Sequence, residues 1–260
     1  ILGAALAAPW LAPQNPYDLM QIDILDSRLP PGSASADGSI TYHLGTDEQG
    51  RDMLSAILYG LRISVSVGVA ATVLALAIGM TLGLIAGFRG GAFDALLMRL
   101  ADLQLAFPSI LVAMILLALF GQGMEKIILA LVASQWAYYA RTTRAAALVE
   151  RDKDYIAAAR RLGLSTPRIV LRHLLPNCLP PLIVVASLQV AAAIALEATL
   201  SFLGLGLPVT EPSLGLLIAN GFQHLYAGRY WISVFPGVAL LLTILAINLV
   251  ADQVRDVLNP

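Results

Sequence analysis

The sequence predicts an all-α membrane protein with six transmembrane helices, the first of them truncated. Of its 260 residues, 58% are hydrophobic and only 13% are charged, whereas about a quarter of an ordinary soluble domain is charged. The mean hydropathy is +0.78, and several apolar runs approach the roughly 20 residues that a helix needs to cross a bilayer. The single cysteine, Cys178, excludes a disulfide within the chain and a multi-cysteine zinc site.

The first element is an apolar run over residues 1–13. We interpret it as part of a first transmembrane helix. The alternative is the tail of a signal peptide, because Ala5-Leu6-Ala7 resembles a cleavage site. Residues 14–62, which follow, are too polar to continue into the membrane.

Three further runs are free of charged residues over the length of a span: residues 63–88, 103–124 and 230–251. Each is bounded by a charged residue at both ends. We therefore predict one continuous transmembrane helix from each run.

Two more spans are less regular. Residues 127–140 are short enough to be a buried helix instead, but Lys126 and Arg141 at their ends could reach the headgroups. Residues 179–203 are long enough but contain Glu197 and begin at Pro180-Pro181. The first turn of a helix tolerates proline, because it loses no hydrogen bond there.

Charge asymmetry orients this six-span arrangement. Of the 16 Lys and Arg residues, eleven fall on the side that holds both termini: Arg89, Arg99, Arg141, Arg144, Arg151, Lys153, Arg160, Arg161, Arg168, Arg172 and Arg255. By the positive-inside rule that side is cytoplasmic. Residues 14–62 and a loop over residues 203–229 then lie outside. The loop contains Pro208 and Pro212, and its length predicts a folded insertion near a pathway or partner, or a cap without ligand contact.

Small residues recur every fourth position in the second span, at Ala75, Gly79, Gly83 and Gly87. Such a stripe lets another helix approach closely. The partner helix could belong to the same chain or to another subunit.

Glu197 is the one acidic residue well inside a predicted span. A carboxylate in hydrocarbon is costly, so it should face the bundle interior, a cavity or a polar partner. A structural, hydrogen-bonded carboxylate and a gate or translocation path are both open, and Glu197 and Ser201 are the candidates for the latter. Asp102 carries less weight, because Arg99 could pair with it on one helix face.

Residues 154–177 form a charged segment between apolar spans, and we read it as two short helices. Tyr155, Ala158, Ala159 and Leu162 recur at helical spacing and predict a narrow, flat apolar face. That face could lie on the headgroups or could dock against a soluble partner.

The joint between these two helices lies at Gly163, where a left-handed residue is expected at a helix C-terminus. Thr166 is the expected N-cap of the second helix, and Pro167 suits its first turn. Pro176 is expected to end it.

ATP and metal sites are not indicated in this chain. A phosphate-binding loop needs G-x-x-x-x-G-K-[ST], and the only two lysines, Lys126 and Lys153, precede Ile127 and Asp154. His43, His173 and His224 are far apart and show no metal-ligand spacing. We predict no cofactor, no metal and no catalytic residue.

The charged segment resembles the EAA loop of ABC importer permeases. The resemblance rests on Ala158-Ala159, on Gly163 and on Leu175-Pro176. Two positions depart from the pattern: Ala157 replaces the usual glutamate, and His173 replaces the usual isoleucine. In that family the loop contacts the ATP-hydrolysing subunit, so we call residues 149–177 the coupling segment.

Other stretches resemble the dipeptide/oligopeptide/nickel branch of that family. They are residues 43–52 (HLGTDEQGRD), residues 197–206 (EATLSFLGLG) and the tail from Asn248 to Asn259-Pro260. The resemblance covers nearly the whole chain and is best with the second of the two permeases that such importers use.

The resemblance implies a type I ABC importer permease in the cell membrane, with residues 63–260 as its core. It also implies a second permease, two ATPase subunits that bind ATP and Mg²⁺, and an external substrate-binding protein that delivers a peptide. The residues that it assigns to coupling are Asp154, Tyr155, Ala157, Ala158, Ala159, Leu162, Gly163, Leu175 and Pro176.

Two rival functions remain at this point: a stand-alone ion-coupled transporter or channel, and a membrane scaffold that anchors a soluble enzyme. A transporter of the first kind should have ionisable residues near the bilayer midplane and internal repeats, and we find only Glu197. The cargo is also open, since dipeptides, longer peptides, nickel chelates and other small solutes all fit the branch. No nucleic-acid partner is indicated.

Overall fold

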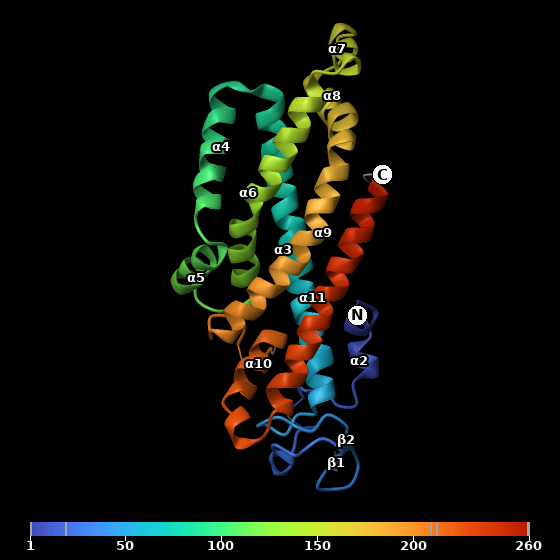
Figure 1. The fold of residues 1–260 in the computed structure, drawn as a ribbon, viewed down its shortest axis with the longest axis vertical. Helices are drawn as coiled ribbons and strands as arrows, with labels where there is room; N and C mark the ends of the chain where they lie inside the picture. Colours follow the sequence, from blue (N-terminus) through green and yellow to red (C-terminus); the bar gives the residue numbers. More distant parts are fainter. Residues whose placement is uncertain (1, 19, 209, 212, 259–260) are drawn as a thin grey trace. The chain divides into compact units, whose positions relative to one another are not determined.

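A computed structural model describes residues 2–18, 20–208, 210–211 and 213–258. Parts of three expectations concern residues outside these ranges: Ile1, Pro212 and Asn259-Pro260. Helices make up most of the chain (Figure 1). The elements are α1 (Leu2–Leu6), α2 (Ala8–Leu11), η1 (Ile24–Asp26), β1 (Ser33–Ala34), β2 (Thr41–Tyr42), α3 (Met53–Arg89), α4 (Gly91–Ala106), α5 (Ser109–Phe120), α6 (Met124–Arg151), α7 (Asp154–Arg161), α8 (Thr166–Ile169), η2 (Val170–Leu174), α9 (Leu175–Phe202), α10 (Leu214–Phe222), η3 (Leu225–Ala227) and α11 (Trp231–Leu258).

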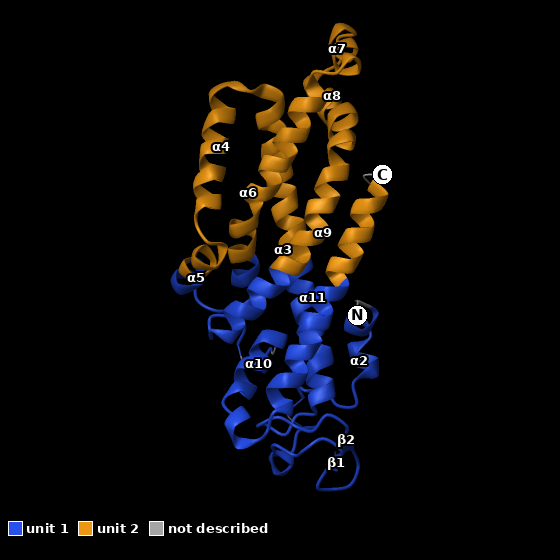
Figure 2. Cartoon of the chain, in the orientation of Figure 1, with its two compact units in different colours: residues 1–69, 116–128, 193–246 blue, residues 70–115, 129–192, 247–260 orange. Residues whose placement is uncertain are grey.

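The chain divides into two compact units (Figure 2). Unit 1 contains residues 1–69, 116–128 and 193–246, and unit 2 contains residues 70–115, 129–192 and 247–260.

Unit 1 contains a small folded region built from the polar segment that follows residue 13. Strands β1 and β2 pair antiparallel, with Ser33 opposite Tyr42. The buried carboxylate of Asp26 accepts hydrogen bonds from the Tyr42 hydroxyl and from the Ala36 amide, both at 2.8 Å. Because a buried carboxylate is stable only when it is hydrogen-bonded, these bonds fix the region as an ordered structure.

The stretch over residues 43–52 is a tight turn whose residue types are explained by its geometry. The Asp47 carboxylate accepts hydrogen bonds from the Gln49 amide at 2.8 Å and from the buried Arg51 side chain at 2.6 Å. Gly50 has a φ of +82°, and a Cβ there would lie 2.1 Å from the Asp23 carbonyl oxygen. Asp52, the residue before α3, accepts from the Ser55 amide at 2.8 Å and caps the start of this helix.

The described part of the loop over residues 203–229 is folded and contains α10. The Ser213 hydroxyl accepts a hydrogen bond from the Leu216 amide at 3.3 Å and caps this helix. Gly215 packs against the backbone of α9, where an added Cβ would lie 2.3 Å from the Ala198 carbonyl oxygen. Helix α10 is therefore held directly against α9.

Unit 2 is built around the close packing of α3 on α6. A Cβ added at Gly79 would lie 2.4 Å from the Trp136 carbonyl oxygen, and one added at Gly83 would lie 2.5 Å from the Ala140 carbonyl oxygen. At Gly87 it would lie 2.7 Å from the Ala147 side chain. The small-residue stripe therefore packs against a helix of the same chain, which was one of the two partners that the sequence left open.

Helix α4 is joined to α6 by two ion pairs. Arg144 forms a bidentate pair with Asp94, with nitrogen–oxygen distances of 2.5 and 2.7 Å. Arg141 pairs with Asp102. The expected pairing of Asp102 with Arg99 is therefore wrong, because the guanidinium of Arg141 takes the carboxylate.

The prediction of one continuous helix over residues 103–124 is wrong. Helix α4 ends at Ala106 and α5 starts at Ser109, with a bend of 93° between them. Pro108 explains the break, because the residue before a proline is pushed out of the helical region. Phe107 has an extended backbone, with φ −92° and ψ 141°.

Helix α9 departs from two expectations at its start. A helical course runs from Thr166 to Phe202, so Pro176 does not end a helix, and Pro180 and Pro181 lie inside one. The five residues of η2 just before it are a π-helix. Such a wider turn accommodates a proline whose missing N–H would leave a gap in the hydrogen-bond ladder.

Among the described residues, three helical stretches are long and apolar enough to cross a membrane, or four if the bent pair α4–α5 counts as one span. They are α3, the course from Thr166 to Phe202 and α11. Residues 2–11 form two short helices. Helix α6 extends beyond the predicted span 127–140 at both ends, and the added residues include charged ones. An all-α membrane protein is confirmed.

Candidate functional site

The coupling segment lies at one end of unit 2, with α7 projecting beyond α8 (Figure 2). Gly163 has a φ of +74°, so the predicted left-handed residue at the joint is confirmed. The predicted N-cap is wrong by one residue: Ser165 occupies the N-cap position and its side chain makes no capping hydrogen bond. Thr166 and Pro167 are already inside α8.

The apolar residues of α7 separate into an inner and an outer set. Ile156 and Ala159 are buried with Ile169, and Phe88 and Leu164 pack against them. Tyr155 is 38% exposed and Leu162 is 79% exposed. Ala157 and Ala158 are exposed as well. The predicted face is therefore divided, because Ala159 turns inward while Tyr155, Ala158 and Leu162 remain on the surface.

Hydrogen bonds fasten the start of α7 to the neighbouring helices of unit 2. The Tyr155 hydroxyl donates to Glu150 Oε2 at 2.5 Å and accepts from Asn177 Nδ2 at 3.2 Å. The Lys153 ammonium lies 2.6 Å from Glu150 Oε1. Asp154 opens α7 with its side chain exposed. An acidic residue in the first turn is favourable, because the N-terminus of a helix carries partial positive charge.

Ionisation of this cluster follows from its contacts. The hydrogen bonds from Lys153 and Tyr155 lower the pKa of Glu150 below its ordinary value. Burial, followed by the hydrogen bond to Glu150, raises the pKa of Tyr155 to about 12. The phenol is therefore protonated at neutral pH and donates to an ionised carboxylate, which is a strong kind of hydrogen bond.

Two arginines connect the coupling segment to the end of α3. Arg151 donates from Nη1 to the Gly87 carbonyl oxygen at 2.7 Å. The Arg160 guanidinium lies 5.0 Å from the centre of the Phe88 ring, within the range of a cation–π interaction. The coupling segment is therefore in direct contact with the last turn of α3.

At the other end of the segment, Leu174 is buried in a second apolar cluster with Leu84, Ala147 and Cys178. Leu175 packs on the margin of that cluster, and Pro176 is exposed. The Asn177 side chain donates to the His173 carbonyl oxygen at 2.7 Å. The Leu175-Pro176 pair thus lies where α9 begins. Leu174 and Leu175 anchor the segment in this cluster.

The gate candidate Glu197 is fully buried in unit 1 and both of its oxygens are hydrogen-bonded. Ser64 Oγ on α3 donates to Oε2 at 3.0 Å, and Ser201 Oγ donates to Oε1 at 2.7 Å. Ser64 Oγ also accepts from the Leu214 amide at 3.3 Å. The carboxylate therefore joins α3, α9 and the start of α10.

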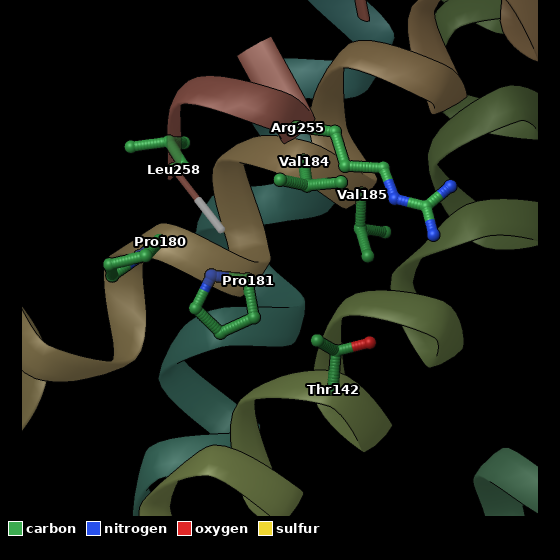
Figure 3. A pocket seen from close by; sticks show the side chains of 7 residues that line it. All are labelled: Thr142, Pro180, Pro181, Val184, Val185, Arg255 and Leu258. Carbon is green, nitrogen blue, oxygen red and sulfur yellow. The ribbon is translucent and has the colours of Figure 1, made fainter. Parts of the chain in front are cut away.

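A pocket of about 360 Å³ opens in unit 2 between α6, α9 and α11 (Figure 3). Its lining residues are Thr142, Pro180, Pro181, Val184, Val185, Arg255 and Leu258. Arg255 is its only charged lining residue. Elsewhere, the part of the chain that the structure describes holds no group of three or more His, Cys, Asp or Glu side chains suited to a metal ion.

Sequence reasoning missed the partners that hold these candidates. Glu150, Arg160 and Phe88 fasten the coupling segment, and Ser64 holds Glu197 across 133 positions of sequence. The Arg160–Phe88 and Ser64–Glu197 contacts leave no local signal in the sequence, because each depends on how helices that are distant in the sequence pack together. Only the charged cluster over residues 150–154 could have been recognised from spacing.

Comparison with known proteins gives a family match over residues 79–260, described as a binding-protein-dependent transport system inner membrane component. The di/tripeptide transport system permease protein DppC of Pseudomonas aeruginosa is 40% identical over 260 residues, covering 100% of this chain and 84% of that protein. The dipeptide transport system permease protein DppC of Escherichia coli is 43% identical over 260 residues, covering 100% of this chain and 85% of that protein.

Among solved structures, the MetNI methionine ABC transporter in inward-facing conformations has a similar fold. One of its chains superimposes with a TM-score of 0.63 at 19% sequence identity, covering 80% of this chain and 98% of that chain. At this identity the likeness concerns the fold alone. The expected type I importer permease fold is confirmed.

Proposed function

The chain belongs to the family of binding-protein-dependent transport system inner membrane components, and we propose that it forms half of the translocation pathway of an ATP-driven peptide importer. It is a transport subunit and is not itself catalytic. The relatives are named for dipeptides and tripeptides, and short peptides are accordingly the proposed cargo. Nickel chelates or another small solute would be carried by the same architecture.

The observation that carries the proposal is the coupling segment. Helix α7 presents exposed small and apolar residues, Ala157, Ala158 and Leu162. Its inner face and its two ends are fixed by packing, hydrogen bonds and a cation–π contact. A helix that is rigidly held from behind and apolar in front is suited to receive force from a partner surface.

The proposed partner at this face is an ATPase subunit. The assembly that we propose contains a second permease, two ATPase subunits that bind ATP and Mg²⁺, and an external binding protein. When ATP closes the ATPase pair, the coupling segments move together and the pathway opens outward; hydrolysis allows it to relax. The segment runs over residues 149–177 and includes Asp154, Tyr155, Ala157, Ala158, Ala159, Leu162, Gly163, Leu175 and Pro176.

Ala157 decides the character of this contact. Since it stands where the family pattern has a glutamate, the helix offers a methyl group there in place of a carboxylate. Shape and apolar fit would then supply most of the contact energy, and burial of apolar surface contributes about 25 cal/mol per Å².

The proposed topology follows the charge distribution. Both termini and the coupling segment are cytoplasmic. Residues 14–62 and 203–229 are extracytoplasmic, residues 1–13 are part of a first transmembrane helix, and residues 63–260 are the core. Glu197 and Ser201 hold the outer end of the pathway in shape by joining three helices.

The proposal is tested with the complete importer, purified with its partner subunits and reconstituted into vesicles. We expect ATP-dependent uptake of radiolabelled alanyl-alanine in the presence of the binding protein. Replacing Leu162 by Asp places a charge on the most exposed apolar residue of the face. It should abolish co-purification of the ATPase subunits, because a desolvated charge without a partner is strongly unfavourable.

Val257→Asp is the matched control. Val257 is 77% exposed, lies in the same unit on α11 and is outside the coupling segment. The control should retain the ATPase subunits and uptake. Full assembly and uptake in Leu162→Asp would contradict the proposed docking face.

A further inference from the structure

A second pocket lies in unit 1, where the extracytoplasmic segment, α3 and the loop before α10 meet. Its volume is about 460 Å³, within the range of roughly 300–1,000 Å³ typical of small-molecule sites. It is lined by Tyr17, Tyr59, Arg62, Ile63, Ser66, Met124 and Glu211. None of these residues takes part in the coupling segment or in the Glu197 cluster.

One face of α3 supplies most of the lining. Tyr59, Arg62, Ile63 and Ser66 recur at i, i+3, i+4 and i+7, which places them on the same side of a helix. Met124 adds an apolar side chain from the start of α6. The wall therefore carries aromatic, apolar and charged groups side by side.

The two charged residues of the pocket have opposite signs, and neither forms an ion pair with any residue in the described ranges. Arg62 and Glu211 share the lining without neutralising each other. An arrangement of this kind favours a ligand that carries both charges, because each charge-assisted hydrogen bond is stronger than a neutral one.

The two tyrosines form the rest of the enclosure. Their rings meet edge to face with centroids 5.3 Å apart. The Tyr17 hydroxyl is buried, and it has no hydrogen-bond partner in the part of the chain that the structure describes. Burial raises the pKa of Tyr17 above its ordinary value, so the phenol keeps its proton. An unpaired buried hydroxyl is unfavourable, and a small shift of the Tyr17 side chain that brings it to a hydrogen-bonding group in the pocket would relieve this cost.

We propose that this pocket receives a short zwitterionic peptide on its way from the binding protein into the translocation pathway. Arg62 holds the terminal carboxylate, Glu211 holds the terminal ammonium group, and the Tyr17 hydroxyl donates to a peptide carbonyl. Tyr59, Ile63 and Met124 contact the peptide side chains without selecting one sequence. The inference rests on the proposed function, and it adds a contact site for the cargo.

The dimensions fit short peptides. An extended chain spans at most about 3.3–3.6 Å per residue, so the two ends of a dipeptide are about 7 Å apart. A zwitterionic dipeptide carries its opposite charges at its two ends, and the pocket lining offers one residue of each sign. A docked protein surface is the competing occupant, since it could use the same two charges from outside.

The experiment uses the complete importer in nanodiscs and vesicles, with radiolabelled alanyl-alanine as the probe. Arg62→Gln and Glu211→Gln each remove one charge. Lys126→Gln and Glu125→Gln are the matched controls: both residues are exposed, lie in the same unit next to Met124 and do not line the pocket. We expect uptake per ATP hydrolysed to fall about tenfold or more in the two pocket variants and to stay unchanged in the controls.

The peptide-loaded binding protein should stimulate ATP hydrolysis with the same KM in all four variants. A raised KM in the pocket variants, with normal uptake per ATP, would show that the charges dock the binding protein and would overturn the inference. Equal uptake in pocket and control variants would overturn it as well.

A direct binding measurement separates this inference from the proposed function. In nanodiscs without binding protein, saturation-transfer NMR should detect alanyl-alanine on the wild-type complex. N-acetylation of the peptide should weaken the signal, and Glu211→Gln should remove this discrimination. Binding that is weakened by N-acetylation in the wild type but not in Glu211→Gln supports the proposed pocket, whatever the vesicles show. Absence of peptide uptake by the vesicles would contradict only the proposed function. Absence of binding would overturn the pocket.

Discussion

At the scale of single residues, Gly163 and Glu197 are the positions at which local geometry constrains function most. Gly163 takes a left-handed backbone at an exposed joint with nothing within 4 Å of an added Cβ. A side chain at position 163 is therefore disfavoured by the positive φ of the backbone and not by contact with neighbouring atoms. Glu197 has the opposite situation, since its backbone is ordinary helix and both carboxylate oxygens are occupied by serine hydroxyls.

Replacing Gly163 by Val should uncouple ATP hydrolysis from uptake. A β-branched residue with positive φ costs about 1–2 kcal/mol, so the joint would leave the left-handed region and α7 would change direction. Substrate-stimulated ATPase activity and uptake of the reconstituted importer are the measurements. Gly237→Val is the control, because Gly237 also has open space around an added Cβ but no positive φ. Full coupling in Gly163→Val would refute the role of the joint.

Replacing Glu197 by Leu should lower the thermal stability of the complex, whereas Glu197→Gln should be close to wild type. Leucine leaves Ser64 and Ser201 without their acceptor, at a cost of about 1–3 kcal/mol. Glutamine can accept from one serine and donate to the other. Thermal unfolding of the detergent-solubilised complex gives the comparison. If both variants unfold at the wild-type temperature, the carboxylate does not hold these helices together.

At the scale of helices, sequence patterns located the elements and misplaced several of their ends. Apolar runs and the glycine stripe identified α3, α9 and α11, because burial in lipid needs long uncharged stretches. The predictions were wrong at prolines in both directions. Pro108 breaks a predicted span, as the local rule for the residue before a proline would indicate, whereas Pro176, Pro180 and Pro181 lie within a continuous helical course. A proline restricts the backbone, but the surrounding packing decides whether the chain turns or absorbs the defect in a π-turn.

Replacing Gly79 by Ala should destabilise unit 2. The added methyl group would lie 2.4 Å from the Trp136 carbonyl oxygen and 2.6 Å from the Tyr139 Cβ atom, so α3 and α6 would have to separate. Overpacking of this kind typically costs about 1–3 kcal/mol. The yield of monodisperse complex and its unfolding temperature should both fall. Gly237→Ala, with open space around the Cβ, should behave as wild type; a similar loss there would point to a general intolerance of the fold.

At the scale of the whole molecule, composition and charge asymmetry predict the class and a topology, but they do not predict which side chains meet. The split of α7 into inner and outer residues depends on Ile169, on the next helix, and on Phe88, which comes from a distant part of the chain. The same holds for the pocket around Arg62, whose lining comes from four separate segments. Contacts of this kind are set by tertiary packing and leave no periodic signal in the sequence.

The predicted topology is open to a cysteine-accessibility test in a Cys178→Ala background. Ala36 and Arg168 are both exposed and belong to different units. In intact cells, a membrane-impermeant thiol reagent should modify Ala36→Cys and should modify Arg168→Cys only after lysis, because the positive-inside rule places the coupling segment in the cytoplasm. The reverse pattern would invert the orientation and exclude an ATPase partner at α7.

The glycine stripe on α3 also restricts how force can travel through the protein. Backbone carbonyls of α6 lie so close to Gly79 and Gly83 that a Cβ at either position would clash with them. A rotation of α3 that brought a larger residue to these positions is therefore unfavourable, and the close fit favours movement of the two helices as a pair. Arg151 at the end of α6 donates to Gly87, and Arg160 of α7 contacts Phe88. In the proposed mechanism, a push on the coupling segment therefore reaches the end of α3 both from α7 and through α6.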